Sequence, residues 1–251
     1  MIKILDSLTQ MKTTVSAILQ KYQPEFHHVV SFHPEKDRLL LLDFTTKNEE
    51  ISEELVNDTQ LFGAYINQKL RMANAKFGIG GYNEYRELYS RSRVFDPDSP
   101  SAGGGKAEAE PRRLHLGTDI WGKPYTAVMS PCDGLVHSFA FNNRFGDYGA
   151  TLILSHNIEE VSFHTLYGHL SLNSIKNFRE GENVRKGDVI GEFGIPMENG
   201  QWPPHLHFQV IEDMEDWQGD YPGVCSISEK EKFLNNCPDP DLILQMMRYA
   251  I

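Results

Sequence analysis

Hydrophobic and polar residues alternate most regularly over residues 204–210. In an extended strand the three apolar side chains of this stretch point to one face, and His205, His207 and Gln209 point to the other. The apolar face is typical of a strand that packs on a core. The polar face carries two imidazoles, which can share one metal ion or divide metal binding and proton transfer between them. Such a His-x-His pair is weak by itself and gains weight only from the rest of the chain.

Apolar residues recur at helical spacing in the first part of the chain. The spacing predicts an amphipathic helix over residues 1–20, ended by Pro24, and a second helix over residues 52–75. Between them, residues 27–30 and 38–44 form short apolar segments that can pair as a hairpin.

The pattern changes from Arg112 onward, where short β-rich runs alternate with Gly and Asp turns. The predicted strands are 134–139, 150–155, 162–167 and 188–193. Many short strands at close spacing indicate an antiparallel β sandwich or barrel. After these strands, short helices are predicted over 229–234 and 241–249, so the fold class is α+β, mainly antiparallel β with a helical N-terminal region.

The clearest boundary in the chain lies at residues 96–111, which are rich in Pro, Gly and Ser and lack apolar periodicity. Such a stretch is typical of a linker or mobile loop, and it can equally be a loop beside the functional site. We therefore expect a helical accessory region at 1–95, a β domain at 112–212 and a helical extension at 213–251.

Composition narrows the function only by exclusion. The 251 residues include 40% hydrophobic and 24% charged residues, as in ordinary globular proteins, and the formal net charge is -11. This charge argues against nucleic-acid and anionic-membrane partners, which need clustered Lys and Arg. No apolar segment resembles a signal peptide or a membrane span, and the three cysteines suit free thiols, so we expect a cytoplasmic protein.

A second group of candidate ligands precedes the β-rich region. His115 and Asp119 stand four residues apart, with Gly117 leaving space between them. Together with His207 they supply the His-Asp-His donors of a zinc site whose fourth position stays open, as in catalytic rather than structural sites. Zinc lowers the pKa of a water in that position to near 7, which yields hydroxide at neutral pH.

Four ordered motifs resemble peptidase family M23, the lysostaphin-like or LytM-like zinc endopeptidases. They stand here as His115–Asp119, Tyr167–Leu170, Arg185–Gly191 and His205–Phe208, within a resemblance that spans roughly residues 112–212. Four motifs in the same order are far more specific than any one of them.

This resemblance implies a fold, a metal and a set of site residues. The fold is a duplicated hybrid β motif, and residues 112–212 become the catalytic domain. Zinc is assigned to His115, Asp119 and His207, and His169 and His205 are assigned as catalytic histidines. One such histidine can take the proton of the nucleophilic water, while the other steadies the charged intermediate.

The chain departs from the family pattern near the expected substrate groove. Gln209 stands where the family commonly has Glu, and Trp202 with two following prolines replaces a loop of small residues. A stiffer, narrower groove favours short soluble peptides over a cross-linked polymer. Four arginines are candidates to attract a substrate carboxylate through paired hydrogen bonds, namely Arg86, Arg91, Arg112 and Arg113.

The sequence thus predicts a zinc-dependent metallohydrolase that cleaves peptide or peptide-like amide bonds, with soluble cell-wall-type peptides or peptidoglycan fragments as substrate. The alternative is a non-catalytic zinc-binding module that regulates or scaffolds a partner. All five site residues are present, which favours the enzyme. The oligomeric state stays open.

Overall fold

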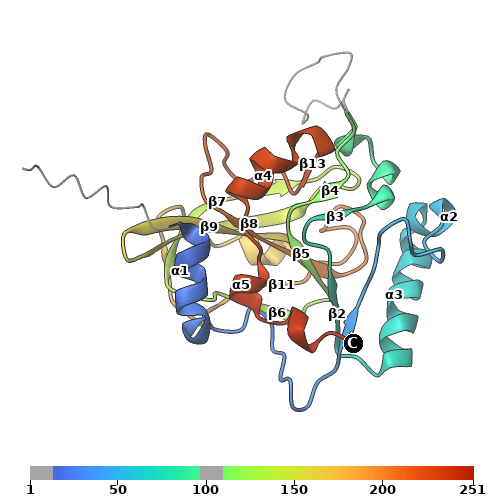
Figure 1. Ribbon diagram of the computed structural model, residues 1–251, viewed down its shortest axis with the longest axis horizontal. Helices are drawn as coiled ribbons and strands as arrows, with labels where there is room; N and C mark the ends of the chain where they lie inside the picture. The colour runs from blue at the N-terminus through green and yellow to red at the C-terminus, as the bar shows by residue number, and fades with distance from the viewer. Residues whose placement is uncertain (1–13, 97–109) are drawn as a thin grey trace, which may run out of the picture.

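A large mixed β-sheet runs through the molecule, with helices on its faces and at its edges (Figure 1). The structure, a computed structural model, describes residues 14–96 and 110–251. The helix predicted over residues 1–20 therefore lies largely outside the described residues, and so does most of the predicted linker at 96–111.

The main sheet has eight strands in the order β1-β2-β5-β12-β9-β8-β7-β10, and only the β1–β2 pair is parallel. In this order the strands are β1 (Leu39–Leu41), β2 (Phe77–Gly80), β5 (Thr118–Trp121), β12 (His205–Ile211), β9 (Val161–Leu170), β8 (Gly149–Ile158), β7 (Gly134–Asn142) and β10 (Asn183–Val184). Two smaller sheets join β6 (Ala127–Met129) to β11 (Val189–Glu192), and β3 (Glu84–Tyr85) to β4 (Leu114–His115) and β13 (Val224–Cys225).

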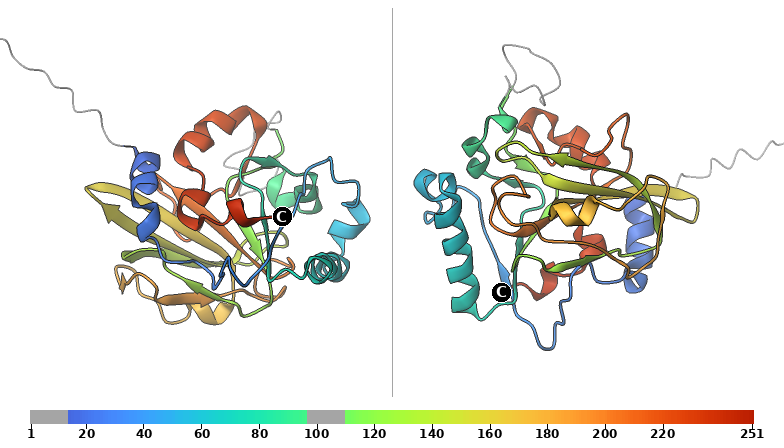
Figure 2. Two further views of the ribbon diagram at one scale, coloured as in Figure 1. Left: turned by 60° about the horizontal axis from the view of Figure 1, so that its bottom comes forward. Right: turned by 180° about the vertical axis from the view of Figure 1, so that it is seen from behind.

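The helices are short apart from one. They are α1 (Val15–Tyr22), α2 (Glu53–Asn57), α3 (Thr59–Ala73), α4 (Lys230–Asn236) and α5 (Asp241–Leu244). The 3₁₀ helices are η1 (Gln23–Glu25), η2 (Glu87–Arg91), η3 (Arg93–Phe95), η5 (Leu172–Ile175), η6 (Ile227–Glu229) and η7 (Met247–Tyr249). Figure 2 shows α3 beside the β2 end of the main sheet and α1 toward its other end.

Most predicted elements are present, and their ends have local causes. The helix predicted over 52–75 is divided into α2 and α3 at Asp58, whose carboxylate accepts hydrogen bonds from the amides of Gln60 and Leu61. An acceptor at that position caps a new helix rather than continuing the old one. The α+β class, mainly antiparallel β with helices, is confirmed.

The core lies on the apolar face of β12, as the alternation predicts. Leu206, Phe208 and Val210 are fully buried in the largest hydrophobic cluster, with residues of β8 and β9 and of α1 and α5. The opposite face of β12, with His205, His207 and Gln209, is also buried, because other segments cover it. The sheet therefore places a polar row inside the protein, where each polar group needs a partner.

The hairpin predicted between residues 27–30 and 38–44 is wrong. Residues 27–30 form no strand, and β1 pairs in parallel with β2. The description of residues 1–95 as a helical accessory region also needs correction, because β1 and β2 extend the main sheet by pairing β2 with β5. The hydrogen bonds of this sheet therefore cross the predicted domain boundary.

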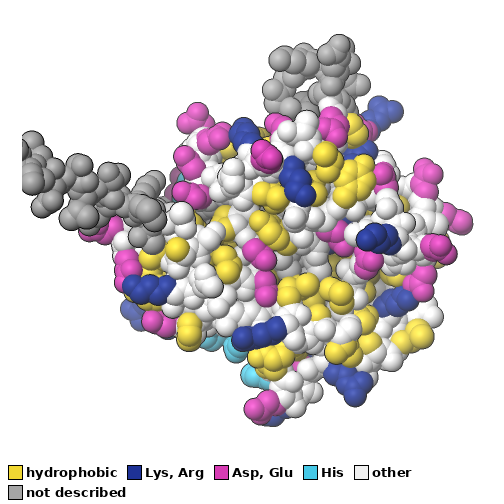
Figure 3. All heavy atoms as spheres, viewed as in Figure 1, with side chains coloured by type: hydrophobic (Ala, Val, Ile, Leu, Met, Phe, Trp, Pro, Cys, Tyr) yellow, Lys and Arg dark blue, Asp and Glu magenta, His cyan; other side chains and the backbone are white. Residues whose placement is uncertain are grey.

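No helix within the described ranges combines the length and apolar character needed to cross a bilayer. On the face shown in Figure 3, acidic and basic side chains are interspersed around patches of hydrophobic ones.

Candidate metal centre

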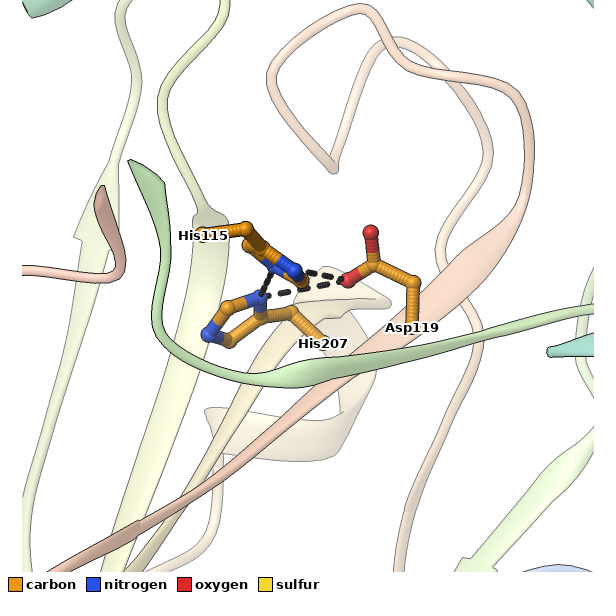
Figure 4. A group of neighbouring side chains, drawn as sticks. All are labelled: His115, Asp119 and His207. Atoms are coloured by element: carbon orange, nitrogen blue, oxygen red, sulfur yellow. Dashed lines mark hydrogen bonds and ion pairs between the residues drawn. The ribbon is translucent and has the colours of Figure 1, made fainter. Parts of the chain in front are cut away.

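Strands β5 and β12 are antiparallel neighbours, and their register places Asp119 directly opposite His207. His115 ends β4, four residues before Asp119, and only two residues separate β4 from β5. Figure 4 shows the three side chains converging on one point. These are the three ligands predicted from the sequence, and the structure brings all three together.

The donor atoms are spaced as a metal requires. His115 Nε2 lies 2.9 Å from His207 Nδ1 and 3.3 Å from Asp119 Oδ1, and His207 Nδ1 lies 3.2 Å from the same Asp119 oxygen. Bonds of about 2.0–2.2 Å in tetrahedral geometry place neighbouring donors a little over 3 Å apart. A zinc ion therefore fits this donor set with small adjustments.

The ring tautomers of both histidine ligands are fixed by oxygen acceptors. His115 Nδ1 donates to the carbonyl oxygen of Gly81 at 2.9 Å, and His207 Nε2 donates to Gln209 Oε1 at 2.9 Å. Each ring is left with its lone pair on the nitrogen that faces the site. Gln209, which replaces the family's usual Glu, thus still orients His207.

Two glycines make room for the His207 side of the site. A Cβ on Gly117 would come within 2.5 Å of His207 Cε1. The sequence predicted that Gly117 leaves room for the metal ion, whereas in the structure it leaves room for the His207 ring. Gly168 of β9 is paired with His207 of β12, and a Cβ on Gly168 would come within 2.5 Å of the Tyr148 ring. Tyr148 can therefore lie against His207, with its hydroxyl 3.5 Å from His207 Nε2.

Arg86 holds the third ligand. Its Nη1 donates to Asp119 Oδ2 at 2.6 Å, while Asp119 Oδ1 faces the two histidines. Arg86 is 1% exposed and also pairs with Glu84. Burial opposes ionisation of Asp119, but His115 and Arg86 hold the pKa of its carboxyl well below its usual range. Asp119 is therefore charged, and its Oδ1 is available to bind a metal ion.

The two predicted catalytic histidines lie next to this group. The ring centroids of His169 and His205 are 4.1 Å apart, and His205 Nε2 is 4.0 Å from Asp119 Oδ1. His205 also stacks on Trp121 with ring centroids 3.9 Å apart. The structure thus brings all five predicted site residues together.

A local irregularity in β9 aims His169. The β8–β9 register shifts between Ala150 and Leu152, and His169 has φ +62°, which is uncommon for a residue with a side chain. Its Nδ1 donates to the carbonyl oxygen of Asn199 at 2.8 Å, and His205 Nδ1 donates to that of Pro203 at 2.8 Å. Both rings therefore keep Nε2 as a proton acceptor.

Burial keeps these imidazoles neutral. It lowers the pKa of His115 to about 3 and that of His205 to about 4. Burial and the neighbouring His205 hold the pKa of His169 well below its usual range. Neutral imidazoles are the form that binds a metal or accepts a proton.

Most residues of the site line a pocket that is formed by distant segments of the chain. Asp119, His169, His205 and His207 line it together with Tyr89 and other residues of η2 and η3. The lining also includes Arg112, Asp147, Tyr148 and Asp220. Sequence reasoning missed Tyr148, Asp147 and Asp220, because nothing in the local pattern shows which loops will face the ligands.

The predicted role of the four arginines needs correction. Arg86 is fully engaged with Asp119 and Glu84, and Arg113 pairs with Asp96 at 3.1 Å. Arg91 lies over the Trp202 ring at 4.5 Å and donates to Thr59 at 3.0 Å. Arg86 and Arg112 line the pocket, and of these two Arg112 alone has no ion pair in the described part of the chain.

Fold and site together define a class: a mainly β protein with a buried His-Asp-His group beside a pocket and two more neutral histidines next to it. Residues 113–218 match the model of peptidase family M23. This matched part, which is less than half of the chain, is therefore similar to the metallopeptidases of that family.

Two curated relatives agree with this family. An L-Ala--D-Glu endopeptidase of Bacillus subtilis (strain 168) is 34% identical over 119 residues, which cover 44% of this chain and 34% of the relative. An uncharacterized metalloprotease of Haemophilus influenzae is 34% identical over 100 residues, which cover 39% of this chain and 18% of the relative. The chain thus matches about a third or less of the length of either relative.

Solved structures with similar parts include a zinc containing peptidase from Vibrio cholerae. It is 30% identical, with a TM-score of 0.32, over 39% of this chain and 27% of its own. The catalytic domain of lysostaphin from Staphylococcus simulans is 20% identical, with a TM-score of 0.38, over 68% of this chain and 96% of its own.

Proposed function

We propose that this protein is a zinc-dependent hydrolase that cleaves peptide or peptide-like amide bonds. The observation that carries the proposal is the set of four histidine tautomers. His115, His169 and His205 each donate Nδ1 to a backbone carbonyl, and His207 donates Nε2 to Gln209. The nitrogens left as acceptors thus gather around the Asp119 carboxylate, a costly arrangement for a purely structural cluster.

We assign the site residues to two roles, metal ligands and general acid-base residues. His115, Asp119 and His207 would hold zinc, which when bound supplies Lewis acidity and a water of lowered pKa. His205 and His169 stay neutral, and their Nε2 atoms are free to take a proton from water and return it to the leaving amine. Tyr148 adds a hydroxyl 3.5 Å from His207 Nε2. Tyr148 also lines the pocket, so its hydroxyl can donate a hydrogen bond to a substrate bound there.

We also propose that the substrate is a short soluble peptide, including peptidoglycan-type fragments. Trp202, which is 3% exposed, lines the pocket, and so do Tyr89 and Phe95 from the N-terminal region. Rigid aromatic walls admit a narrow chain more readily than a cross-linked polymer. The duplicated hybrid fold and the cytoplasmic location expected from the sequence are part of the same proposal.

Metal analysis tests the proposed zinc ligands. Zinc-loaded wild-type protein should contain about one zinc per chain, and His207→Ala should lose it, because two ligands hold zinc far more weakly than three. His33→Ala, which changes an exposed histidine, is the matched control. Protein that holds no zinc, or a His207→Ala variant that holds it as well as wild type, would contradict the metal assignment.

A side-by-side assay tests the activity. Zinc-loaded protein is incubated with a soluble peptide library and with intact peptidoglycan sacculi, and new amino groups are counted. We expect turnover of short peptides and weak or absent release from sacculi. Strong release from sacculi alone would contradict the substrate proposal. Full zinc binding without hydrolysis of either would favour the regulatory or scaffold module.

A further inference from the structure

The pocket that Asp119 and His207 line also carries charges of both signs that form no ion pair with one another in the described ranges. Arg112, Asp147 and Asp220 all line this pocket. No ion pair within 4.0 Å joins Arg112 to either carboxylate in the described ranges, although both carboxylates act on the pKa of Arg112. Opposite charges that face one pocket without pairing leave room for a ligand that carries both.

The two carboxylates each keep one oxygen available. Asp147 Oδ1 accepts from the Tyr148 amide at 2.9 Å, and Asp220 Oδ1 accepts from the Tyr221 amide at 2.8 Å. These bonds fix both side chains. Asp147 Oδ2 has only the exposed Arg144 at 4.0 Å, and Asp220 Oδ2 has no ion pair within the described residues. Two fixed carboxylate oxygens in one pocket suit a substrate ammonium, which donates up to three hydrogen bonds.

The two carboxylates are partly buried and influence each other. Burial and the nearby Asp147 raise the pKa of Asp220 to about 6, and burial raises that of Asp147. A bound ammonium would relieve both effects.

Arg112 supplies the complementary charge. Its Nη2 donates to the carbonyl oxygen of Val94, while its Nε is buried without a hydrogen-bond partner. A buried guanidinium donor without a partner is costly, and a carboxylate that accepts from Nε and a terminal nitrogen would satisfy it. This is an observation independent of the acidic pair.

This part of the pocket adjoins the reacting centre through Tyr148. This residue directly follows Asp147 and lies against His207 with ring centroids 5.2 Å apart. Asp220 is also close in sequence to a residue beside the metal group, because Gly223 lies three positions after it. A Cβ on Gly223 would collide with the Tyr148 hydroxyl and lie 3.2 Å from His207 Cε1. A group bound here is therefore part of a substrate that also reaches the metal ligands.

We infer that Arg112, Asp147 and Asp220 form a subsite for an unblocked α-amino-carboxylate, a group with an ammonium and a carboxylate on one carbon, at one end of the substrate. The inference rests on the proposed peptide hydrolysis and names the substrate class. Peptides with a free amino-acid head, such as the side-chain end of a diaminopimelate residue, are preferred over peptides whose end is neutral or singly charged.

The test compares three matched peptides, Ala-Ala-X, in which X is meso-diaminopimelate, lysine or norleucine. The side chain of X then ends in an α-amino-carboxylate, an ammonium alone or a methyl group. Dissociation constants are measured calorimetrically with the zinc-loaded protein of residues 1–251, and hydrolysis is followed in parallel. We expect each lost charged group to weaken binding about tenfold, as for one charge-assisted hydrogen bond.

Variants assign the charges. Asp220→Asn should weaken the diaminopimelate and lysine peptides about tenfold and leave the norleucine peptide unchanged, whereas Arg112→Gln should weaken the diaminopimelate peptide alone. Asp216→Asn and Arg93→Gln change exposed residues nearby in the sequence and should have no effect. If a variant does not fold, the wild-type peptide series alone decides.

The outcomes separate this inference from the proposed function. Equal affinity for the three peptides, or variants that weaken all of them alike, would overturn the subsite even if hydrolysis proceeds. Binding that depends on the end group without any hydrolysis would keep the subsite and overturn the proposed activity.

Discussion

Arg86 shows how one residue outside the metal group can set its chemistry. It occupies one oxygen of Asp119, so the other oxygen is directed to the histidines. It fits only because Gly81 lacks a side chain, since a Cβ there would collide with the Arg86 guanidinium. Arg86 therefore acts as a positioning residue for the ligand.

We expect Arg86→Met to weaken zinc binding about 10–100-fold, the usual effect of losing a group that orients a metal ligand. Arg86→Lys should recover part of this affinity, because an ammonium can make one of the hydrogen bonds but not the fork. Zinc affinity is measured by chelator competition, with circular dichroism to check folding and Arg93→Met as an exposed control. A folded Arg86→Met variant with wild-type affinity would show that Asp119 is positioned without it.

His169→Ala and His205→Ala should keep zinc but lose about 10²–10⁴-fold in hydrolysis, the usual value of general acid-base help. Neither ring supplies one of the three closely spaced donor atoms, so the metal content should not change. The half-buried His137, paired with Ser138, gives a matched control as His137→Ala. Either variant hydrolysing a peptide substrate at the wild-type rate would remove that histidine from the mechanism.

The sequence was sufficient to select His115, Asp119 and His207 as candidate ligands, which the structure brings together, but it did not predict the residues that orient them. His115, Asp119 and His207 follow from residue type and spacing, because three donors with an open position are chemically distinctive. Arg86 and the Gly81 carbonyl come from a segment more than thirty residues upstream, and their role depends on β2 pairing with β5. The local sequence pattern does not predict which distant strands will pair.

At the scale of elements, the strands that alternate clearly were predicted and the irregular ones were not. The runs within β7, β8 and β9 are rich in β-branched and aromatic residues. Strand β2 reads Phe-Gly-Ile-Gly, and glycine normally argues against a strand. Here the glycines are required, since a Cβ on Gly78 would lie 2.3 Å from the Leu42 side chain and one on Gly80 2.6 Å from the Leu42 carbonyl oxygen.

The β8–β9 pair makes a prediction about acid stability. His156 is 3% exposed, its Nε2 bonds Thr165 at 2.7 Å, and burial lowers its pKa to about 4. Its folded pKa is depressed, so the unfolded chain takes up the proton first as pH falls below about 6.5. The free energy of unfolding should therefore fall between about pH 6.5 and 4, with this residue contributing up to about 3 kcal/mol.

Urea unfolding of metal-free protein at several pH values measures this loss. His156→Gln should reduce the pH slope, because glutamine keeps a polar group but cannot be protonated in this range. The exposed His33→Gln variant should leave the slope unchanged. An identical slope for wild type and His156→Gln would show that other buried histidines carry the acid sensitivity.

At the scale of the whole molecule, the part that matches the family and the N-terminal region share one sheet. Strand β2 covers the edge of β5, and Trp121 of β5 packs against Phe44 and Phe62 with ring centroids 5.4 and 5.7 Å apart. The N-terminal region also supplies Arg86 and part of the pocket wall. The region that resembles the family is therefore incomplete as a site by itself.

A fragment of residues 110–251 should bind zinc more weakly than the whole chain and should associate. Removing β1 and β2 exposes a strand edge and the Trp121 ring, both of which favour aggregation. Size-exclusion chromatography and zinc titration of fragment and whole chain measure the two effects. A monomeric fragment with unchanged zinc affinity would show that the N-terminal region is dispensable for the site.

The contact between His115 and His207, which are far apart in the sequence, has a consequence for the order of folding. These ligands are 92 positions apart, and neighbouring Arg86 and Asp119 are 33 apart, so long loops must close before the donor set exists. Contacts of such long range form slowly, and the metal cannot direct the early steps. Zinc would instead act as a late clamp, which binds only the finished fold and slows its opening, so its free energy of binding adds directly to the native state.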